Sequence, residues 1–286
     1  MVNLKMLSIC SKTTKDLSFY RTVHNFQHYS EISNFSEFYD YFQWSKDNAI
    51  KIYIVGNGSN TLFTKKNIKS LVLKNKLPNK IEVLSEGNIL VSSSVLIIDI
   101  LKYCYESSFD SFYYLASVPA TVGGALAMNA GRGRHHNLSI YDFVESVTFF
   151  DAEDNQIKTM DKTQIVKGYR ETIFTGLTSK LILNATFKFV PKELDSNPII
   201  ERRKWSKEFQ DYSVPNCGSV FKECDFKILE KLKGLCISQS CFSSKSINWI
   251  INRSQDSKPI VLLIKIAQFL HLLKFRKAIL EIITVE

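Results

Sequence analysis

Two short glycine-containing segments constrain the fold of this chain more than any other feature. The sequence VGNGSN occupies residues 55–60, directly after the apolar run IYIV, and VPATVGGALAMNAG occupies residues 118–131. Glycine adopts positive φ at little cost, so the first segment can turn successive backbone N–H groups toward one point, as a pyrophosphate requires. In the second, Pro119 and Thr121 suit the start of a helix, where Gly123 and Gly124 allow a ligand phosphate to approach the backbone. Together they predict a dinucleotide cradle.

Each segment also has a purely structural interpretation. The first is compatible with an Asn-Gly hairpin turn between IYIV and TLF, and the second with a small-residue helix packed tightly on a sheet. The two segments are separated by predicted strands and a helix. They do not match a Rossmann fingerprint, which places GxGxxG in one strand–turn–helix unit with an acidic residue downstream.

Helix and strand patterns alternate through the first two thirds of the chain. Aromatic and apolar residues recur at helical spacing in some segments, and β-branched runs separated by turn residues mark others. This alternation predicts a mixed α+β fold. The expected elements are a helix within residues 32–44, a strand at 51–55, a β-meander over 70–94, a helix ending at Cys104, and strands at 143–150 and 181–190.

The segment at residues 191–197 crowds proline, aspartate, asparagine and charge together, which is typical of a linker. A second unit is therefore expected to begin after it. This unit should contain a charged helix over residues 199–209, an amphipathic helix over 260–273 and a final β-branched strand over 279–285.

Composition excludes several classes of protein. The chain has 286 residues, 45% of them hydrophobic, and no apolar run long enough to span a bilayer. The first ten residues lack the pattern of a signal peptide, so a cytoplasmic protein without membrane insertion is expected. The net charge of +9 could help attract a phosphorylated ligand, but no basic block is interleaved with aromatics, so no nucleic-acid partner is expected. The sequence does not indicate an oligomeric state.

The cysteines include no CxxC pair, which argues against a zinc site or a disulfide framework. We therefore expect reduced thiols and no metal site. The six are Cys10, Cys104, Cys217, Cys224, Cys236 and Cys241.

Two further motifs follow the glycine segments, GYRETIF at residues 168–174 and NCGSVFK at residues 216–222. In this order and spacing, the four motifs resemble those of the UDP-N-acetylenolpyruvoylglucosamine reductase (MurB) family of flavoenzymes, from residue 51 to the end. The resemblance implies an α+β fold with a two-lobed FAD-binding domain of the vanillyl-alcohol-oxidase/MurB (PCMH) type and a C-terminal α+β substrate domain. The implied FAD-binding domain spans 15–192, with lobes at about 15–70 and 71–192, and the substrate domain spans 198–286.

The resemblance also implies site residues. An arginine can hold a carboxylate through its fixed, permanently charged guanidinium, which suits Arg170 for stabilising an enolate-like intermediate. The position of Ser219 corresponds to the family's proton donor, and that of Glu281 to its assisting glutamate. Tyr169, Lys207 and Lys222 are expected to bind substrate. The residues expected to bind FAD are Gly56, Asn57, Gly58, Ser59, Asn60, Thr121, Val122, Gly123, Gly124 and Asn129.

Several positions depart from the family pattern. Ser117 and Ala120 stand where the family usually has glycine, and Glu223 and Cys224 replace an Asn-Pro pair after NCGSVFK. A carboxylate beside a diphosphate is repulsive unless it is protonated or turned away. Ser246 replaces a family histidine. The predicted substrate domain therefore departs further from the family than the flavin domain does.

Three functions remain open at this stage. The resemblance implies NADPH-dependent reduction of FAD followed by reduction of UDP-GlcNAc-enolpyruvate to UDP-N-acetylmuramate for peptidoglycan. A paralogous reductase could act on another nucleotide-linked sugar, for example in surface polysaccharide synthesis. The chain could also bind flavin without turnover. Glu223 favours the last two, while Arg170, Ser219 and Glu281 favour the first two.

Overall fold

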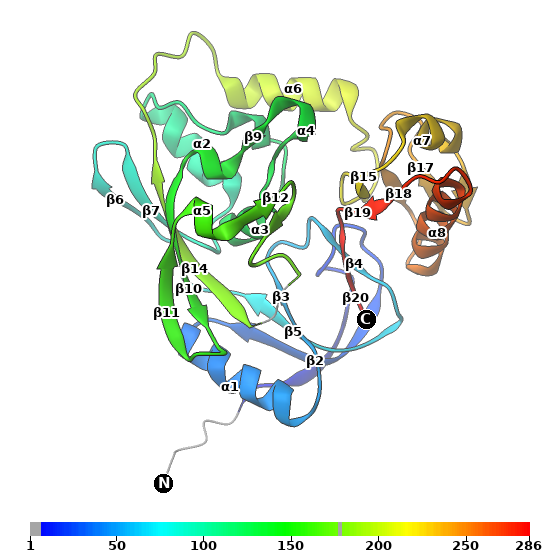
Figure 1. Cartoon of the computed structure of the whole chain (residues 1–286), viewed down its shortest axis with the longest axis horizontal. Coiled ribbons are helices and arrows are strands. Elements are labelled where there is room, and N and C mark those ends of the chain that lie inside the picture. The colour runs from blue at the N-terminus through cyan, green and yellow to red at the C-terminus, as the bar shows by residue number, and fades with distance from the viewer. Residues whose placement is uncertain (1–6, 177–178) are drawn as a thin grey trace.

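A computed structural model of the protein describes residues 7–176 and 179–286; residues 1–6, which form part of the leading segment considered above, lie outside the described residues. Figure 1 shows two sheets packed side by side, with a smaller, mainly helical C-terminal part beyond them. Among the described residues, no helix has both the length and the apolar character needed to cross a membrane.

The first sheet has four strands in the order β1-β2-β5-β3, which are Cys10–Thr14, His24–Ile32, Asn67–Asn75 and Ile52–Val55. β5 pairs in parallel with both β2 and β3 and is largely buried, as a central parallel strand requires. Helix α1 (Phe35–Asp47) connects β2 to β3, and the side chain of Asn34 caps it by accepting a hydrogen bond from the Ser36 amide. The expected helix within 32–44 and strand at 51–55 are confirmed.

The second sheet is antiparallel and has five strands in the order β11-β10-β14-β7-β6. Their bounds are Gln156–Met160, Val144–Asp151, Lys180–Lys188, Asn88–Ser92 and Ile81–Ser85. Helices α2 (Ile97–Glu106) and α3 (Val122–Ala127) bury their apolar side chains against this sheet in one large core.

The expected β-meander over residues 70–94 is only partly correct. β6 and β7 form an antiparallel hairpin, but β5 belongs to the other sheet. The side chain of Asn75 accepts a hydrogen bond from the Leu77 amide at the end of β5, and the chain then crosses from one sheet to the other. A periodicity of two marks a strand but does not specify its partner.

The C-terminal part has three helices, α6 (Pro198–Phe209), α7 (Phe226–Leu232) and α8 (Lys258–Leu273). Helices α7 and α8 pack around short strands, whereas α6 buries Ile199 in the core of the second sheet (Figure 1). The strands are β15 (Phe221–Glu223), β16 (Cys236–Ile237), β17 (Ser240–Phe242), β18 (Ile250–Asn252) and β19 (Ile279–Leu280). Tyr20 and Leu62, from the first lobe, share a hydrophobic core with this part. The division into domains at 15–192 and 198–286 stays a prediction.

The last strand is not continuous, which corrects the strand expected over residues 279–285. β19 pairs antiparallel with β15, whereas β20 (Ile283–Val285) pairs in parallel with β4 (Thr61–Phe63). The break falls at Glu281 and Ile282. β4 has no pairing with β3, so the alternative of a simple hairpin turn at residues 56–60 is wrong.

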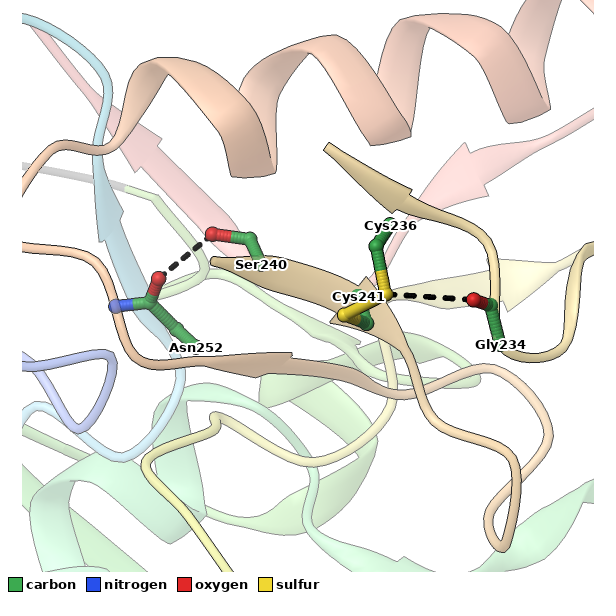
Figure 2. The surroundings of a disulfide bond; sticks show 5 residues. All are labelled: Gly234, Cys236, Ser240, Cys241 and Asn252. Atoms are coloured by element: carbon green, nitrogen blue, oxygen red, sulfur yellow. Dashed lines mark hydrogen bonds between the residues drawn. A yellow bond between two sulfur atoms is a disulfide. The ribbon is translucent and has the colours of Figure 1, made fainter. Parts of the chain in front are cut away.

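Two cysteines differ from expectation. Cys236 and Cys241 lie opposite each other in the β16–β17 hairpin and form a disulfide, and the Cys236 sulfur also contacts the carbonyl oxygen of Gly234 (Figure 2). On the next strand pair, the Ser240 hydroxyl donates to the side-chain oxygen of Asn252 at 2.7 Å. The prediction that all six thiols are reduced is wrong because adjacent antiparallel strands bring cross-strand residues within bonding reach.

The remaining elements are short and surround the glycine segments and the GYRETIF motif. They are η1 (Tyr113–Leu115), β8 (Gly131–Arg132), α4 (Gly133–His136), β9 (Leu138–Ser139), η2 (Ile140–Asp142), α5 (Lys162–Ile165), β12 (Val166–Gly168) and β13 (Glu171–Thr172).

Candidate active site

The two glycine segments meet in space. The Asn57 side chain donates a hydrogen bond to the carbonyl oxygen of Pro119 at 2.7 Å. A Cβ on Gly56 would lie 2.5 Å from the Thr121 hydroxyl, closer than real contacts allow. The absence of a side chain at position 56 therefore lets a loop of the first sheet lie directly against the start of α3.

The backbone donors of the two segments differ in availability. In α3, the amides of Val122 and Gly123 donate to carbonyls of the second lobe, and the Gly124 amide donates to the Thr121 hydroxyl. Within the described part of the chain, the amides of residues 57–60 have no such acceptor. Unpaired donors converging in a glycine-containing turn form an anion-binding concavity. The first loop therefore offers the free N–H groups that a pyrophosphate needs.

Arg170 and Glu281 form an ion pair, with the arginine Nε donating to the glutamate Oε1 at 3.0 Å. Both side chains are largely buried, with exposed fractions of 11% and 17%. The two terminal nitrogens of Arg170 donate to the carbonyl oxygens of Asn129 and Gly131, at 2.8 and 2.7 Å. This planar fork is fixed in orientation by three acceptors from distant segments.

The electrostatic environment of Glu281 combines opposing effects. Burial is the largest effect and raises the pKa of its carboxyl, while the charge and hydrogen bond of Arg170 and the charge of Lys222 lower it. Desolvation therefore prevails over the two cations. A carboxyl with a raised pKa, held next to a fixed guanidinium, is suited to exchange a proton within the site.

Ser219 lies in the turn that precedes β15, and its backbone is tied to Glu281. The Glu281 amide donates to the carbonyl oxygen of Val220 at 2.8 Å, and the Asn60 side chain donates to the carbonyl oxygen of Glu281 at 3.0 Å. Gly218, just before the serine, has φ of +72°, a conformation that favours glycine. The structure thus brings Ser219, Glu281 and the first glycine loop to one place. In the described residues, the Ser219 hydroxyl makes no intramolecular hydrogen bond.

The three predicted substrate-binding residues occupy different surroundings. The ring of Tyr169 lies between the guanidinium groups of Arg134 and Arg170, 4.9 and 4.8 Å from its centroid. Lys222 pairs with Glu171 at 3.1 Å and acts electrostatically on Glu281. Lys207 lies exposed on α6, and its carbonyl oxygen accepts a hydrogen bond from Lys245. Tyr169 and Lys222 thus join the Arg170–Glu281 pair, whereas no contact ties Lys207 to it within the described residues.

Three hollows surround these residues. A cavity of about 390 Å³ is lined by Asn129, Tyr169 and Arg170, and a small one of about 80 Å³ by Gly56, Thr121, Gly123 and Gly124. A third, of about 460 Å³, lies between the first glycine loop and α6 and is lined by Asn57, Pro119, Ala120 and Lys207. Predicted residues of both glycine segments, with Tyr169, Arg170 and Lys207, therefore line these three hollows, whereas Ser219, Lys222 and Glu281 line none of them.

Sequence reasoning missed the residue that positions the serine turn. The side chain of Asn248 accepts from the Phe221 amide and donates to the Phe221 carbonyl, and its own carbonyl accepts from the Val220 amide. Its φ of 69° is a conformation that asparagine tolerates better than most residues. An asparagine within SINW was the available signal. Arg134, which packs on Tyr169, was also missed.

No cluster of three or more metal-binding side chains is present in residues 7–176 and 179–286.

A family model and a solved structure are similar to this chain. A family model described as an FAD binding domain matches residues 30–160, which include both glycine segments. A solved structure of UDP-N-acetylenolpyruvylglucosamine reductase (MurB) from Thermus caldophilus has the same fold, with a TM-score of 0.76 at 18% identity, covering 97% of this chain and all of that one. Fold and matched domain define the class as α+β FAD-binding proteins of the PCMH type.

Two curated relatives define the family. UDP-N-acetylenolpyruvoylglucosamine reductase of Clostridium beijerinckii is 32% identical over 215 residues, covering 72% of this chain and 69% of the relative. The reductase of Aquifex aeolicus is 32% identical over 235 residues, covering 78% and 76%. The chain belongs to the UDP-N-acetylenolpyruvoylglucosamine reductase family.

Proposed function

We propose that this chain is an FAD-dependent, NADPH-linked reductase that converts UDP-GlcNAc-enolpyruvate to UDP-N-acetylmuramate, a cytoplasmic step in peptidoglycan precursor synthesis. Family membership supports this reaction. The observation that carries the proposal is the buried Arg170–Glu281 pair, joined through the Val220 backbone to the Ser219 turn. Three segments far apart in the sequence supply the three groups that this reduction needs.

The residues present fit FAD. The free amides of residues 57–60 would hold its pyrophosphate, and Lys74, whose ammonium donates to the Gly56 carbonyl, adds positive charge beneath that loop. Gly56 and Gly123 let the backbone pack directly against Thr121 and Ser93, where a Cβ would collide, and so hold the two glycine segments in place beside one another. When bound, FAD supplies the hydride chemistry, taking a hydride from NADPH and delivering it to the enol ether.

Arg170 would bind and orient the substrate carboxylate. Its guanidinium already has three acceptors, but each terminal nitrogen carries a second N–H that can face a ligand. Because the fork is held by backbone carbonyls, little reorganisation is required as negative charge develops on the substrate. Glu281, whose pKa is raised by burial, would exchange a proton with neighbouring groups.

Ser219 would deliver the proton to the carbon next to the carboxylate. A hydroxyl is a weak acid in water, so this role requires a site in which the developing charge is stabilised and the hydroxyl is reprotonated. Its half-buried position next to Val220, whose carbonyl accepts from the Glu281 amide, supports that role.

The departures from the family favour one alternative, a reductase for another nucleotide-linked sugar. Glu223 is half-buried directly after Lys222, where it would face a diphosphate unfavourably. Ser246 carries no such implication, because it is buried and its hydroxyl accepts a hydrogen bond from the Asp211 amide. It therefore has a structural role in the C-terminal part.

An anaerobic two-step experiment tests the proposed function. The flavin of the purified protein is reduced with NADPH, UDP-GlcNAc-enolpyruvate is added, and the absorbance of oxidised flavin is followed. Its rapid return is the expected result. A flavin that NADPH reduces but this substrate does not reoxidise would favour another nucleotide-sugar acceptor, and a flavin that NADPH does not reduce would favour a flavin-binding protein without turnover.

Replacing Ser219→Ala tests the proton donor. We expect reduction by NADPH to continue unchanged, while reoxidation by substrate slows roughly 10²-fold or more, as for loss of a general acid. Ser36→Ala, at an exposed position of α1, is the matched control and should change neither step. Loss of the first step in Ser219→Ala would contradict the assigned role.

Replacing Glu223→Asn tests the alternative substrate. If the carboxylate faces the diphosphate, the variant should bind UDP-sugars more tightly, because an unfavourable charge is removed. Isothermal titration with UDP alone measures this. An unchanged affinity would mean that Glu223 is directed elsewhere.

A further inference from the structure

The outward face of α8 has an unusual composition. Residues on this face recur at intervals of three and four and are exposed, while the opposite face is buried in the C-terminal core. The solvent side of a surface helix is ordinarily polar. On α8, the exposed positions hold only lysines and large apolar side chains, namely Lys258, Leu262, Lys265, Phe269, Leu272 and Leu273.

The apolar members of this face are extensively exposed. Phe269 is 58% exposed and Leu272 67%, and Leu262 and Leu273 are similar. Phe275, just beyond the helix, is 97% exposed. Single exposed apolar residues are normal, but five on one helix and its C-terminal turn make an apolar patch that would gain from burial.

The charges on α8 and the turn that follows it have one sign, although Asp256 precedes the helix and Asp225 of α7 lies beside Arg276. Residues 257–280 contain no aspartate or glutamate and carry five cations, Lys258, Lys265, Lys274, Arg276 and Lys277. Arg276 lies 3.8 Å from Asp225 of α7. Within the described residues, the four lysines form no salt bridge with any carboxylate. The patch therefore combines uncovered apolar surface with uncompensated positive charge.

We propose that α8 and residues 274–277 dock on the surface of an anionic lipid bilayer. A helix with apolar residues flanked by lysine and arginine lies in the interface between headgroups and acyl chains, where apolar side chains are buried and cations meet anionic headgroups. Figure 1 shows α8 at the outer margin of the C-terminal part, away from both sheets. Docking would be peripheral, because α8 has 16 residues and ends in charge.

Charge argues against a second copy of the chain as the occupant. A twofold interface brings the same patch of both subunits together, so the lysines of one would face those of the other. Like charges across an interface are costly. An anionic surface fits the patch without that cost. The proposal does not depend on the proposed function, since no substrate or cofactor group takes part.

Vesicle sedimentation of the full-length flavin-loaded protein tests the proposal. Vesicles of phosphatidylcholine alone are compared with vesicles of phosphatidylcholine and phosphatidylglycerol in equal parts, at low salt. We expect binding to the anionic vesicles and little to the neutral ones. Lys265→Glu/Lys277→Glu should weaken the binding roughly ten-fold or more, and Phe269→Ser/Leu273→Ser should do the same.

A matched control changes exposed apolar residues elsewhere. Val83 and Leu84 of β6 are 57% and 53% exposed, and Val83→Ser/Leu84→Ser should leave vesicle binding unchanged. Flavin absorbance and circular dichroism establish whether each variant is folded. If the apolar variant does not fold, the vesicle binding of the charge variant alone tests the proposal.

Three results would overturn the proposal. The first is no binding to anionic vesicles, and the second is binding that neither α8 variant reduces. The third is a parent protein that forms a dimer in sedimentation equilibrium and does not bind vesicles, where Phe269→Ser/Leu273→Ser abolishes the dimer. That result would assign the face to a second copy of the chain.

Discussion

At the residue scale, the carboxyl of Glu281 is the group whose chemistry depends most on its surroundings. Burial raises its pKa, and Arg170 and Lys222 oppose that effect. The carboxyl thus holds its proton more tightly in the folded chain than in the unfolded one. Its contribution to the free energy of unfolding is therefore largest at low pH and is lost as pH rises through the interval between the two pKa values.

The direction of the Glu281 pKa shift predicts how stability changes with pH. Between the unfolded pKa, near 4.3, and the higher folded value, the free energy of unfolding of the parent should fall relative to that of Glu281→Gln as pH rises. Arg170→Met should raise the folded pKa of Glu281 further and so extend this pH interval upward, because the guanidinium stabilises the charged carboxylate. Lys222→Met should have the same effect to a smaller extent. Urea unfolding across the pH range measures this, and a parent that gains stability relative to Glu281→Gln over that interval would contradict it.

At the element scale, the β16–β17 hairpin shows how pairing determines chemistry. Cys236 and Cys241 are five residues apart, and only the antiparallel register places them opposite each other. The hairpin packs near α8, and within the described residues no hydrogen bond or ion pair joins it to Arg170 or Glu281. Its cross-link should therefore affect stability more than activity.

Removing the disulfide tests this. Cys236→Ser/Cys241→Ser should lower the free energy of unfolding by about 2 kcal/mol, the loop-closure value for so short a loop, and leave flavin reoxidation unchanged. Cys10→Ser, which removes an exposed free thiol, is the control and should have no effect on unfolding. A variant as stable as the parent under oxidising conditions would mean that the cross-link contributes nothing.

At the scale of the whole molecule, the last residues of the chain join the C-terminal part to β4 and β5. β20 pairs with β4, and the Ser70 hydroxyl donates to the carbonyl oxygen of Glu286 at 2.6 Å. Glu281 lies between β19 and β20, so its position depends on both partners. The site thus combines residues from the N-terminal part of the chain with residues from its last strands.

Deleting residues 283–286 should therefore affect stability and activity together. We expect a fall in Tm of roughly 5 °C or more and flavin reoxidation slowed about ten-fold or more, because Glu281 would lose one of its two anchors. Ser70→Ala removes only one hydrogen bond to this segment and should cost about 1 kcal/mol with activity retained. Full activity after the deletion would show that β19 alone positions Glu281.

The sequence alone determined the class of the protein. Glycines that precede or follow apolar runs, and an arginine and a serine in fixed motifs, are local features, so their identity could be predicted without coordinates. The longer helices α1, α2, α6 and α8 and the strands β3, β10 and β14 followed from periodicity for the same reason. The assignment of individual residues to FAD or substrate stays a prediction.

Only the tertiary structure decided which partners these residues have. The separation of β5 from β6, the break of the last strand at Glu281, the Asn248 contacts and the Cys236–Cys241 bond all depend on segments distant along the chain or on strand register. Periodicity determines the face on which a side chain lies, but not the neighbour that the face meets. For that reason, only the fold shows that Arg170 and Glu281, 111 residues apart in sequence, form a buried ion pair.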